Sequence, residues 1–181
     1  MRVLVAHASK HGATAGIAEH IGATLSEAGH EVRVLPVTET GDVTSYDAVV
    51  VGGATYVGHW RKDATAFVED HRDELAARPV WLFSSGPIGA DKTDKHGADL
   101  RTVSKPQEMD DLVAAIRPRG QRVFFGALDP QELTVSERLV RKLPAGRELL
   151  PEGDFRDWAD VDGWSAEIVR ALGAAGSPAA V

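Results

Sequence analysis

Short apolar runs alternate along the chain with longer segments in which apolar residues recur at helical spacing. Each of five runs predicts a β-strand: residues 2–7, 31–36, 48–53, 80–84 and 122–126. The third run, AVVVGG, has no polar side chain, which is typical of a parallel strand buried on both faces. Helical spacing predicts five helices, at residues 12–28, 60–77, 109–116, 133–143 and 158–172.

Five strands separated by helices predict an α/β fold, in which a doubly wound, mostly parallel five-stranded sheet is the middle of three layers. No internal repeat or linker divides the chain, so we expect one domain over residues 1–173. Residues 174–181 are small and include a proline, which predicts a flexible tail. Ligands of such sheets bind beyond the carboxyl ends of the strands, so functional residues are expected in the loops there.

The turn after the first strand carries hydroxyls and a glycine at the start of a predicted helix. Ser9, Gly12 and Thr14 form the pattern S-x-x-G-x-T. Amides at a helix start are unpaired and partly positive, so they can bind a phosphate, and hydroxyls add neutral donors. Neither G-x-x-x-x-G-K-[ST] nor G-x-G-x-x-G is present, which argues against a P-loop and a dinucleotide turn. A phosphate monoester site and an ordinary turn with a capping hydroxyl both fit these residues.

Two further loops are expected at the same edge of the sheet. Residues 54–60 (ATYVGHW) follow the third strand, and residues 84–91 (SSGPIGAD) follow the fourth. Both loops contain glycine, which allows the backbone to approach a ligand closely, and the first contains aromatic rings. Together with the first turn, these loops would suit a flat ring that is anchored by a phosphate tail.

Composition narrows the classes of partner. The 181 residues carry a net charge of −7 and no lysine- or arginine-rich block, which argues against nucleic acid as a partner. Without cysteine, disulfides, thiolate nucleophiles and Cys-ligated metal sites are excluded. No apolar run approaches the roughly 20 residues of a transmembrane helix, and the first residues form a predicted strand instead of a cationic leader. We therefore expect a cytoplasmic protein without a transmembrane segment.

The first turn also carries a resemblance to a known family. The sequence SKHGAT after an apolar strand resembles the FMN-phosphate loop of flavodoxin-like proteins, and the strand–helix order extends the resemblance over nearly the whole chain. Within this superfamily the chain looks most like the branch that contains the menaquinone-dependent protoporphyrinogen IX dehydrogenases. The segments VGGATYVGHW, GAL (residues 126–128) and DFRDWADVDGW carry that likeness. The resemblance implies FMN as the cofactor, bound by the three loops.

The candidate FMN-binding residues lie in those loops: Ser9, Lys10, His11, Gly12, Ala13, Thr14, Ala54, Thr55, Tyr56, Val57, Gly58, Ser84, Ser85, Gly86, Pro87 and Gly89. His59 is the candidate catalytic residue, since a histidine can relay a proton near neutral pH; the alternative is a solvated loop histidine. Tyr56 and Trp60 are candidates for contact with a ring. No metal site is expected, because the mixed charges at residues 91–96 predict a solvated flap.

Three functions fit these observations. The first is an FMN-dependent dehydrogenase that passes electrons to a quinone, with residues 88–105 as a flap that shapes substrate access. The second is a soluble one-electron carrier that serves a redox partner protein, and the third is a non-catalytic phosphate-binding module. The flap and the branch resemblance favour the enzyme, whereas the acidic surface favours the carrier. We prefer the enzyme, whose small-molecule substrate the sequence does not specify.

The stretch after the fifth strand bears on contact with a membrane. In the resembled branch this stretch is basic and apolar, and it is thought to meet the membrane. Here residues 129–150 (DPQELTVSERLVRKLPAGRELL) take its place, and acidic residues offset their arginines and lysine. The stretch is therefore more polar than the resemblance implies, and peripheral membrane contact stays an open alternative.

Overall fold

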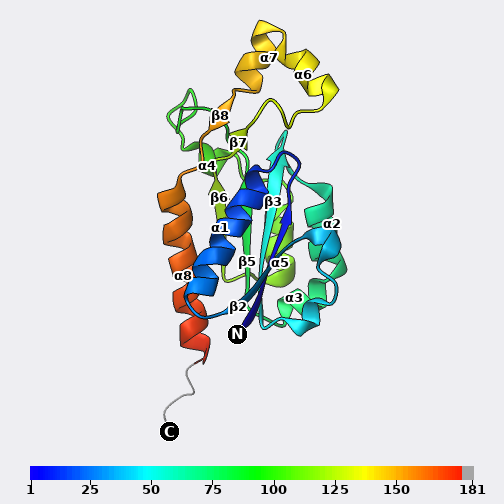
Figure 1. The fold of residues 1–181 in the computed structure, drawn as a ribbon, viewed down its shortest axis with the longest axis vertical. Coiled ribbons are helices and arrows are strands. Elements are labelled where there is room, and N and C mark those ends of the chain that lie inside the picture. Colours follow the sequence, from blue (N-terminus) through cyan, green and yellow to red (C-terminus); the bar gives the residue numbers. More distant parts are fainter. Residues whose placement is uncertain (177–181) are drawn as a thin grey trace.

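The computed structural model describes residues 1–176, in which a parallel sheet separates two layers of helices (Figure 1). The sheet order is β2-β1-β3-β5-β6, and each neighbouring pair along this path is parallel. The strands are β1 (Arg2–Ala8), β2 (Glu31–Pro36), β3 (Ala48–Tyr56), β5 (Val80–Ser85) and β6 (Gly120–Phe124). This confirms the predicted doubly wound fold, in which the strand order reverses between β1 and β3.

Helices cover both faces of the sheet and supply two separate cores. On one face lie α1 (Ala13–Glu27) and α8 (Trp158–Gly176), and on the other lie α2 (Lys62–Asp70), α3 (Arg72–Ala76) and α5 (Met109–Ile116) (Figure 1). Ile17, Ile168 and Phe83 are fully buried in the first core, and Leu75 and Leu82 are fully buried in the second. The sheet is thus buried on both sides, as its unbroken apolar strands predict.

Shorter elements connect these layers. They are two 3₁₀ turns, η1 (Val37–Glu39) and η2 (Val43–Ser45), and the helix α4 (Leu100–Val103), which lies within the polar stretch after β5. In α4, the carboxylate of Asp99 accepts a hydrogen bond from the amide of Arg101, so an N-cap starts the helix. Over residues 1–176, the structure has no helix with the length and apolar character that crossing a bilayer requires.

The third strand is longer than predicted. Residues 54–60 were expected as a loop, but β3 continues to Tyr56 and pairs with β4 (His59–Trp60) in an antiparallel hairpin. The two turn residues, Val57 and Gly58, have φ angles of 52° and 78°. Positive φ at both positions is the requirement of a type I′ turn, which glycine meets without strain and a β-branched residue does not.

Two helix predictions also need correction. The helix expected over residues 60–77 is two helices, α2 and α3, because the chain turns at His71, where φ is −109° and ψ is 25°. The last helix continues to Gly176, four residues beyond the predicted helix end at residue 172. The rest of the predicted tail, residues 177–181, lies outside the described residues.

Residues 127–154, named here the cover segment, stand beyond the carboxyl ends of the strands at one end of the molecule (Figure 1). A short antiparallel pair, β7 (Ala127–Leu128) and β8 (Gly153–Asp154), forms the base of this segment. Two helices lie between these strands, α6 (Val135–Arg141) and α7 (Pro144–Leu149). The predicted helix at residues 133–143 therefore corresponds to α6 alone, and the sequence analysis predicted neither α7 nor the strand pair.

Candidate functional site

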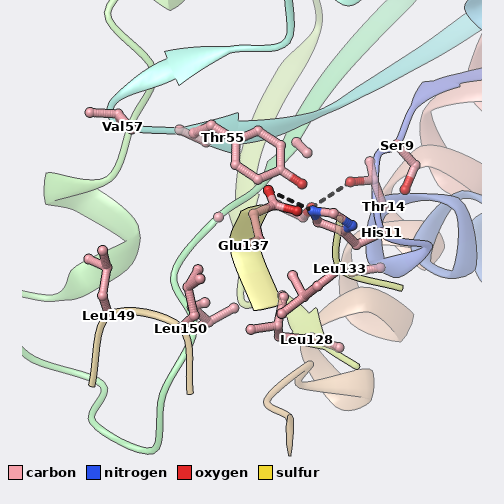
Figure 2. A pocket seen from close by; sticks show the side chains of 18 residues that line it. Ser9, His11, Thr14, Thr55, Val57, Leu128, Leu133, Glu137, Leu149 and Leu150 are labelled. Carbon is pink, nitrogen blue, oxygen red and sulfur yellow. Dashed lines mark hydrogen bonds and ion pairs between the residues drawn. The ribbon is translucent and has the colours of Figure 1, made fainter. Parts of the chain in front are cut away.

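The three predicted loops meet at the carboxyl ends of β1, β3 and β5, where they surround a cavity of about 340 Å³ (Figure 2). Ten of the predicted residues line it: Ser9, His11, Ala13, Thr14, Ala54, Thr55, Tyr56, Val57, Ser85 and Gly86. The cover segment and the residues just before it supply most of the rest. The cavity therefore lies at the switch point of the sheet, which is the expected place for a ligand in this architecture.

The turn at residues 9–14 leaves several hydrogen-bond donors free. Gly12 has a φ of 79° and precedes α1, so the chain enters the helix without a side-chain cap. Among the residues that the structure describes, the backbone amides of Lys10, His11, Gly12 and Ala13 have no acceptor. The buried hydroxyl of Ser9 also has no partner in this part of the chain. A set of unpaired donors at a helix start is a site for an anion.

A hydrogen bond between two hydroxyls connects the first and third loops. Thr14 Oγ1 lies 2.7 Å from Ser85 Oγ, and both side chains are buried (Figure 2). The neighbouring Ser84 is fully buried but does not line this cavity, because alternate residues of a strand face opposite sides of the sheet. Thr14 and Ser85 therefore face the candidate site, whereas Ser84 faces the core on the α5 side.

The β3–β4 hairpin forms one wall of the cavity. Tyr56 is 39% exposed, and its ring lies 5.6 Å from Lys10 Nζ and 6.1 Å from the ring of His11. Partial burial raises the pKa of the Tyr56 phenol to about 12, so this hydroxyl stays protonated at neutral pH. The hydroxyl of Thr55 is buried and has no partner among the described residues, and Val57 is 96% exposed at the tip of the turn. This wall offers an aromatic face and an unused hydroxyl.

Leucines of the cover segment form the facing wall. Leu128 and Leu133 are buried, Leu150 is half-buried and Leu149 is largely exposed at the rim (Figure 2). Ile88 of the polar stretch after β5 completes this apolar lining. None of these five residues was predicted for the site. Within residues 88–105, Ile88 alone lines the cavity, so the cover segment takes the place that the predicted flap was expected to take.

Side chains of the first turn bind the cover segment directly. Lys10 Nζ lies 2.5 Å from Glu137 Oε1, and His11 Nδ1 donates a hydrogen bond of 2.8 Å to the carbonyl oxygen of Glu132. Partial burial acts to raise the pKa of Glu137, but hydrogen bonds from Lys10 and Thr134 outweigh it and lower that pKa to about 2. Glu137 is therefore an anion throughout the physiological range and lies at the edge of a site with free anion-binding donors.

His59, the predicted catalytic histidine, lies outside this cavity. It contacts a second depression on the other side of the hairpin, and its Nδ1 lies 2.6 Å from Glu108 Oε1. Partial burial acts to raise the pKa of Glu108, but hydrogen bonds from His59 and from the Trp60 amide outweigh it and lower that pKa. Trp60 is buried, and its indole nitrogen donates to the carbonyl oxygen of Gly53, so this residue belongs to the core and not to the site.

Other differences remain between the predicted and the observed lining of the cavity. Besides Ser84, five predicted residues do not line the cavity: Lys10, Gly12, Gly58, Pro87 and Gly89. Eight lining residues were not predicted: Ile88, Gly126, Ala127, Leu128, Leu133, Glu137, Leu149 and Leu150. Three of them, residues 126–128, could have been found from their place in the chain, since they follow β6 and thus leave the sheet at the same edge.

Comparison with known proteins decides the family. A family model described as flavodoxin domain matches residues 4–145. The chain belongs to the flavodoxin family. The match covers both the S-x-x-G-x-T turn and the sheet order described above, and FMN is the cofactor of this family. The chain is therefore an FMN-binding flavodoxin-like protein, which confirms the cofactor that the sequence predicts.

Solved structures agree with this fold. A single-residue variant of flavodoxin from Pseudomonas aeruginosa matches with a TM-score of 0.57 and 22% identity, over 95% of this chain and 99% of that one. A flavodoxin from the domain Archaea matches with a TM-score of 0.56 and 14% identity, over 95% and 99%. Rubredoxin oxygen:oxidoreductase from Desulfovibrio gigas matches with a TM-score of 0.56 and 12% identity, over 96% of this chain and 36% of that one. No curated protein matches the chain.

Proposed function

We propose that the cavity binds FMN with its phosphate on the turn at residues 9–14. The free amides and the unpartnered Ser9 hydroxyl are donors for the phosphate, and the Thr14–Ser85 pair fixes the floor below it. The Thr55 hydroxyl is an unused donor on the hairpin wall, at the place proposed for the ring. The residues present therefore fit a flat cofactor with an anionic tail.

The protein's share of the chemistry is to bind the cofactor, orient it and exclude water. FMN, when bound, supplies the transfer of one or two electrons. Tyr56 presents an aromatic face that can pack on a flat ring, while its protonated hydroxyl leaves the wall uncharged. The buried leucines Leu128 and Leu133 keep the opposite side apolar. His59 stays a candidate for proton relay only from outside the cavity, through a substrate that reaches the hairpin.

We further propose that the chain is a dehydrogenase that passes electrons to a quinone. The observation that carries this is the apolar wall of the cover segment, Leu128, Leu133, Leu149 and Leu150, across the cavity from Tyr56. A one-electron carrier needs an open cofactor edge for a partner protein, whereas this wall makes a slot for a small apolar molecule. The branch resemblance suggests a porphyrinogen as the electron donor, so a porphyrinogen is one of the donors to be tried.

A second candidate function is that of a soluble one-electron carrier. The net charge of −7 favours it, because an acidic surface steers basic partner proteins toward the cofactor. The structural neighbours named as flavodoxins agree with the same reading. The redox partner would then dock over the exposed tip of the β3–β4 hairpin, at Val57.

A reaction with two kinds of acceptor separates these candidates. The FMN-loaded chain is reduced anaerobically and mixed with a water-soluble menaquinone analogue or with a basic one-electron acceptor protein. We expect faster oxidation by the quinone, and we expect Leu150→Gln to slow this reaction alone. Leu139→Gln, on the outer face of α6, is the matched control. Faster oxidation by the acceptor protein, at a rate that Leu150→Gln does not change, would establish the one-electron carrier. A protoporphyrinogen, tested as the reductant of the FMN-loaded chain, shows whether it is the electron donor.

The outer face of α6, together with Lys142 and Leu143 just after it, supports peripheral contact with a membrane. Val135 is 84% exposed, Leu139 64% and Leu143 63%, and the basic residues Arg138 and Lys142 lie among them. Exposed apolar side chains beside cations are typical of a helix that binds an anionic bilayer surface. Sedimentation with anionic vesicles tests this point: the chain should bind, and Leu139→Gln should bind less. Equal recovery of both in the supernatant contradicts it.

A further inference from the structure

One acidic side chain of the cover segment lies where the proposed function requires a phosphate nearby. Glu137 Oε1 is 2.5 Å from Lys10 Nζ and 3.4 Å from His11 Nε2, and both partners belong to the turn at residues 9–14. His11 is only 8% exposed, and in the described part of the chain its Nε2 makes no hydrogen bond; the approach of Glu137 is the dashed contact that Figure 2 draws there. The Glu137 carboxylate thus lies beside the side chains of Lys10 and His11, which a phosphate on the turn would also approach.

The negative charge of Glu137 sets this residue apart from the others that line the cavity. Among the side chains of the described residues that line it, Glu137 is the acidic one, and no lysine or arginine lines it. A bound phosphate monoester carries up to two negative charges, and like charges in a partly buried site repel strongly. Lys10 Nζ lies against the Glu137 carboxylate, so a phosphate bound on the turn has to share this ammonium group or take it from Glu137.

We propose that Glu137 competes with the phosphate of FMN for Lys10 and His11, and that this competition sets how strongly the chain prefers FMN over riboflavin. The inference rests on the proposed binding of the phosphate by the turn at residues 9–14. Glu137 is then a specificity-determining residue, since its carboxylate weakens the binding of a phosphorylated flavin and leaves that of an unphosphorylated flavin unaffected.

The same contact connects flavin binding to the cover segment. Lys10 and His11 of the turn contact Glu137 and the carbonyl oxygen of Glu132. These contacts join the turn directly to α6 and to the loop that precedes α6. If the phosphate takes Lys10 from Glu137, it loosens α6; by linkage, whatever loosens α6 strengthens phosphate binding by the same factor. FMN should therefore expose the α6 backbone to solvent, whereas riboflavin should not.

Equilibrium titration of the full-length chain with oxidised FMN and with riboflavin tests the specificity. We expect Glu137→Gln to bind FMN at least about fivefold more tightly, the lower end of ordinary coupling between sites, and to bind riboflavin with unchanged affinity. Glu152→Gln removes the same charge from the same segment at a site 3.2 Å from Arg141 and is the matched control. It should leave both affinities unchanged.

A double-mutant cycle and hydrogen exchange test whether Glu137 acts on FMN binding through Lys10 and α6. In a Lys10→Met background the gain of Glu137→Gln in FMN affinity should largely disappear, because the shared cation is absent. Hydrogen exchange of the α6 amides should increase when FMN or a high concentration of inorganic phosphate is added to the wild-type chain, and riboflavin should have no such effect. Slower exchange with FMN would show that α6 closes on the phosphate instead.

Weaker FMN binding by Glu137→Gln, or equal changes for FMN and riboflavin, would overturn the proposal. The first result would make Glu137 a support of the bound state, and the second would make it a structural residue of the cover segment. Neither result depends on turnover, since the titrations use oxidised flavin. A failure of the quinone experiment leaves this test intact. A separate variant, Thr14→Val, removes one hydroxyl of the turn; if it bound FMN with unchanged affinity, the proposed phosphate site itself would be wrong.

Discussion

The turn at residues 9–14 and the cover segment face each other across one cavity, but they are built in different ways. The turn continues from a buried strand into a buried helix face, and Thr14 within it is fully buried. The cover segment leaves Val135, Leu139 and Leu143 more than 60% exposed, and polar contacts such as Lys10–Glu137 join it to the turn. The turn is thus continuous with the hydrophobic core, whereas the outer part of the cover segment is held at the protein surface by polar contacts.

This difference concerns how each region is held in place, since the family match spans the turn and, up to residue 145, most of the cover segment. The turn holds its free amides in place because β1 and α1, which flank it, pack in the core. The cover segment supplies the leucines and Glu137, which the proposed function uses for acceptor choice and flavin choice. Changes in the two regions should therefore have effects of different size and kind.

The largest expected effect is on stability, in the core that supports the turn. Phe83 is fully buried and makes edge contacts with Phe124 and Trp164, at centroid distances of 5.9 and 6.2 Å. Phe83→Ala should lower the free energy of unfolding by about 3–5 kcal/mol, because a cavity replaces a large apolar side chain. Urea denaturation measures this loss. Leu139→Ala in the cover segment should change the free energy by less than about 0.5 kcal/mol, and a similar loss in both variants contradicts the contrast.

The second effect concerns the turn itself. Thr14→Val removes one hydroxyl and leaves Ser85 without its partner, so FMN binding should weaken by about 1–3 kcal/mol. Flavin titration checks this, and riboflavin should lose less than FMN, because it lacks the phosphate. Thr24→Val, at the far end of α1, where the hydroxyl bonds the carbonyl oxygen of His20, is the control. Unchanged FMN affinity in Thr14→Val would show that the phosphate lies elsewhere.

The turn was predictable from the sequence, because its signals are local. An apolar strand, a glycine and two hydroxyls at a helix start are adjacent in the chain, and the edge of the sheet where they lie follows from the strand order. The loops at Thr55 and Ser85 could be assigned to the same edge for the same reason. The side of the sheet that each loop residue faces did not follow from these signals, as the absence of Ser84 from the cavity lining shows.

The cover segment could not be predicted in the same way. Its leucines at 139 and 143 suggest a helix with a buried face, yet they are exposed, while Leu149 and Leu150 reach the cavity from the end of α7. Apolar spacing shows which residues share a helix face but not whether that face meets the core. The contact between Glu137 and Lys10 joins residues 127 positions apart, and no local pattern indicates it.

A smaller effect on stability is expected at the tip of the β3–β4 hairpin, which lies opposite the leucines of the cover segment. Val57 has a φ of 52°, and a β-branched residue is strained in this conformation by about 1–2 kcal/mol. Val57→Gly should remove that strain, and after the entropic cost of glycine the chain should gain about 0.5 kcal/mol. Thermal unfolding measures the gain. Val135→Gly, at another largely exposed position at the start of α6, should instead reduce stability.

The smallest effect is the pH dependence that Glu137 gives to the cover segment. Its pKa of about 2 is below the ordinary value of a glutamate, so its ionised form stabilises the folded state. This contribution is complete above the ordinary pKa, near 4.3, and is lost as the pH falls toward 2. The free energy of unfolding should therefore decrease less between pH 5 and pH 3 in Glu137→Gln than in the wild type, by about 0.5 kcal/mol after solvent screening. Denaturation at these pH values measures the difference, and Glu152→Gln, with its exposed side chain, should follow the wild type more closely. If the two variants behave alike, the contact with Lys10 does not fix the cover segment, and the two walls of the cavity are independent of each other.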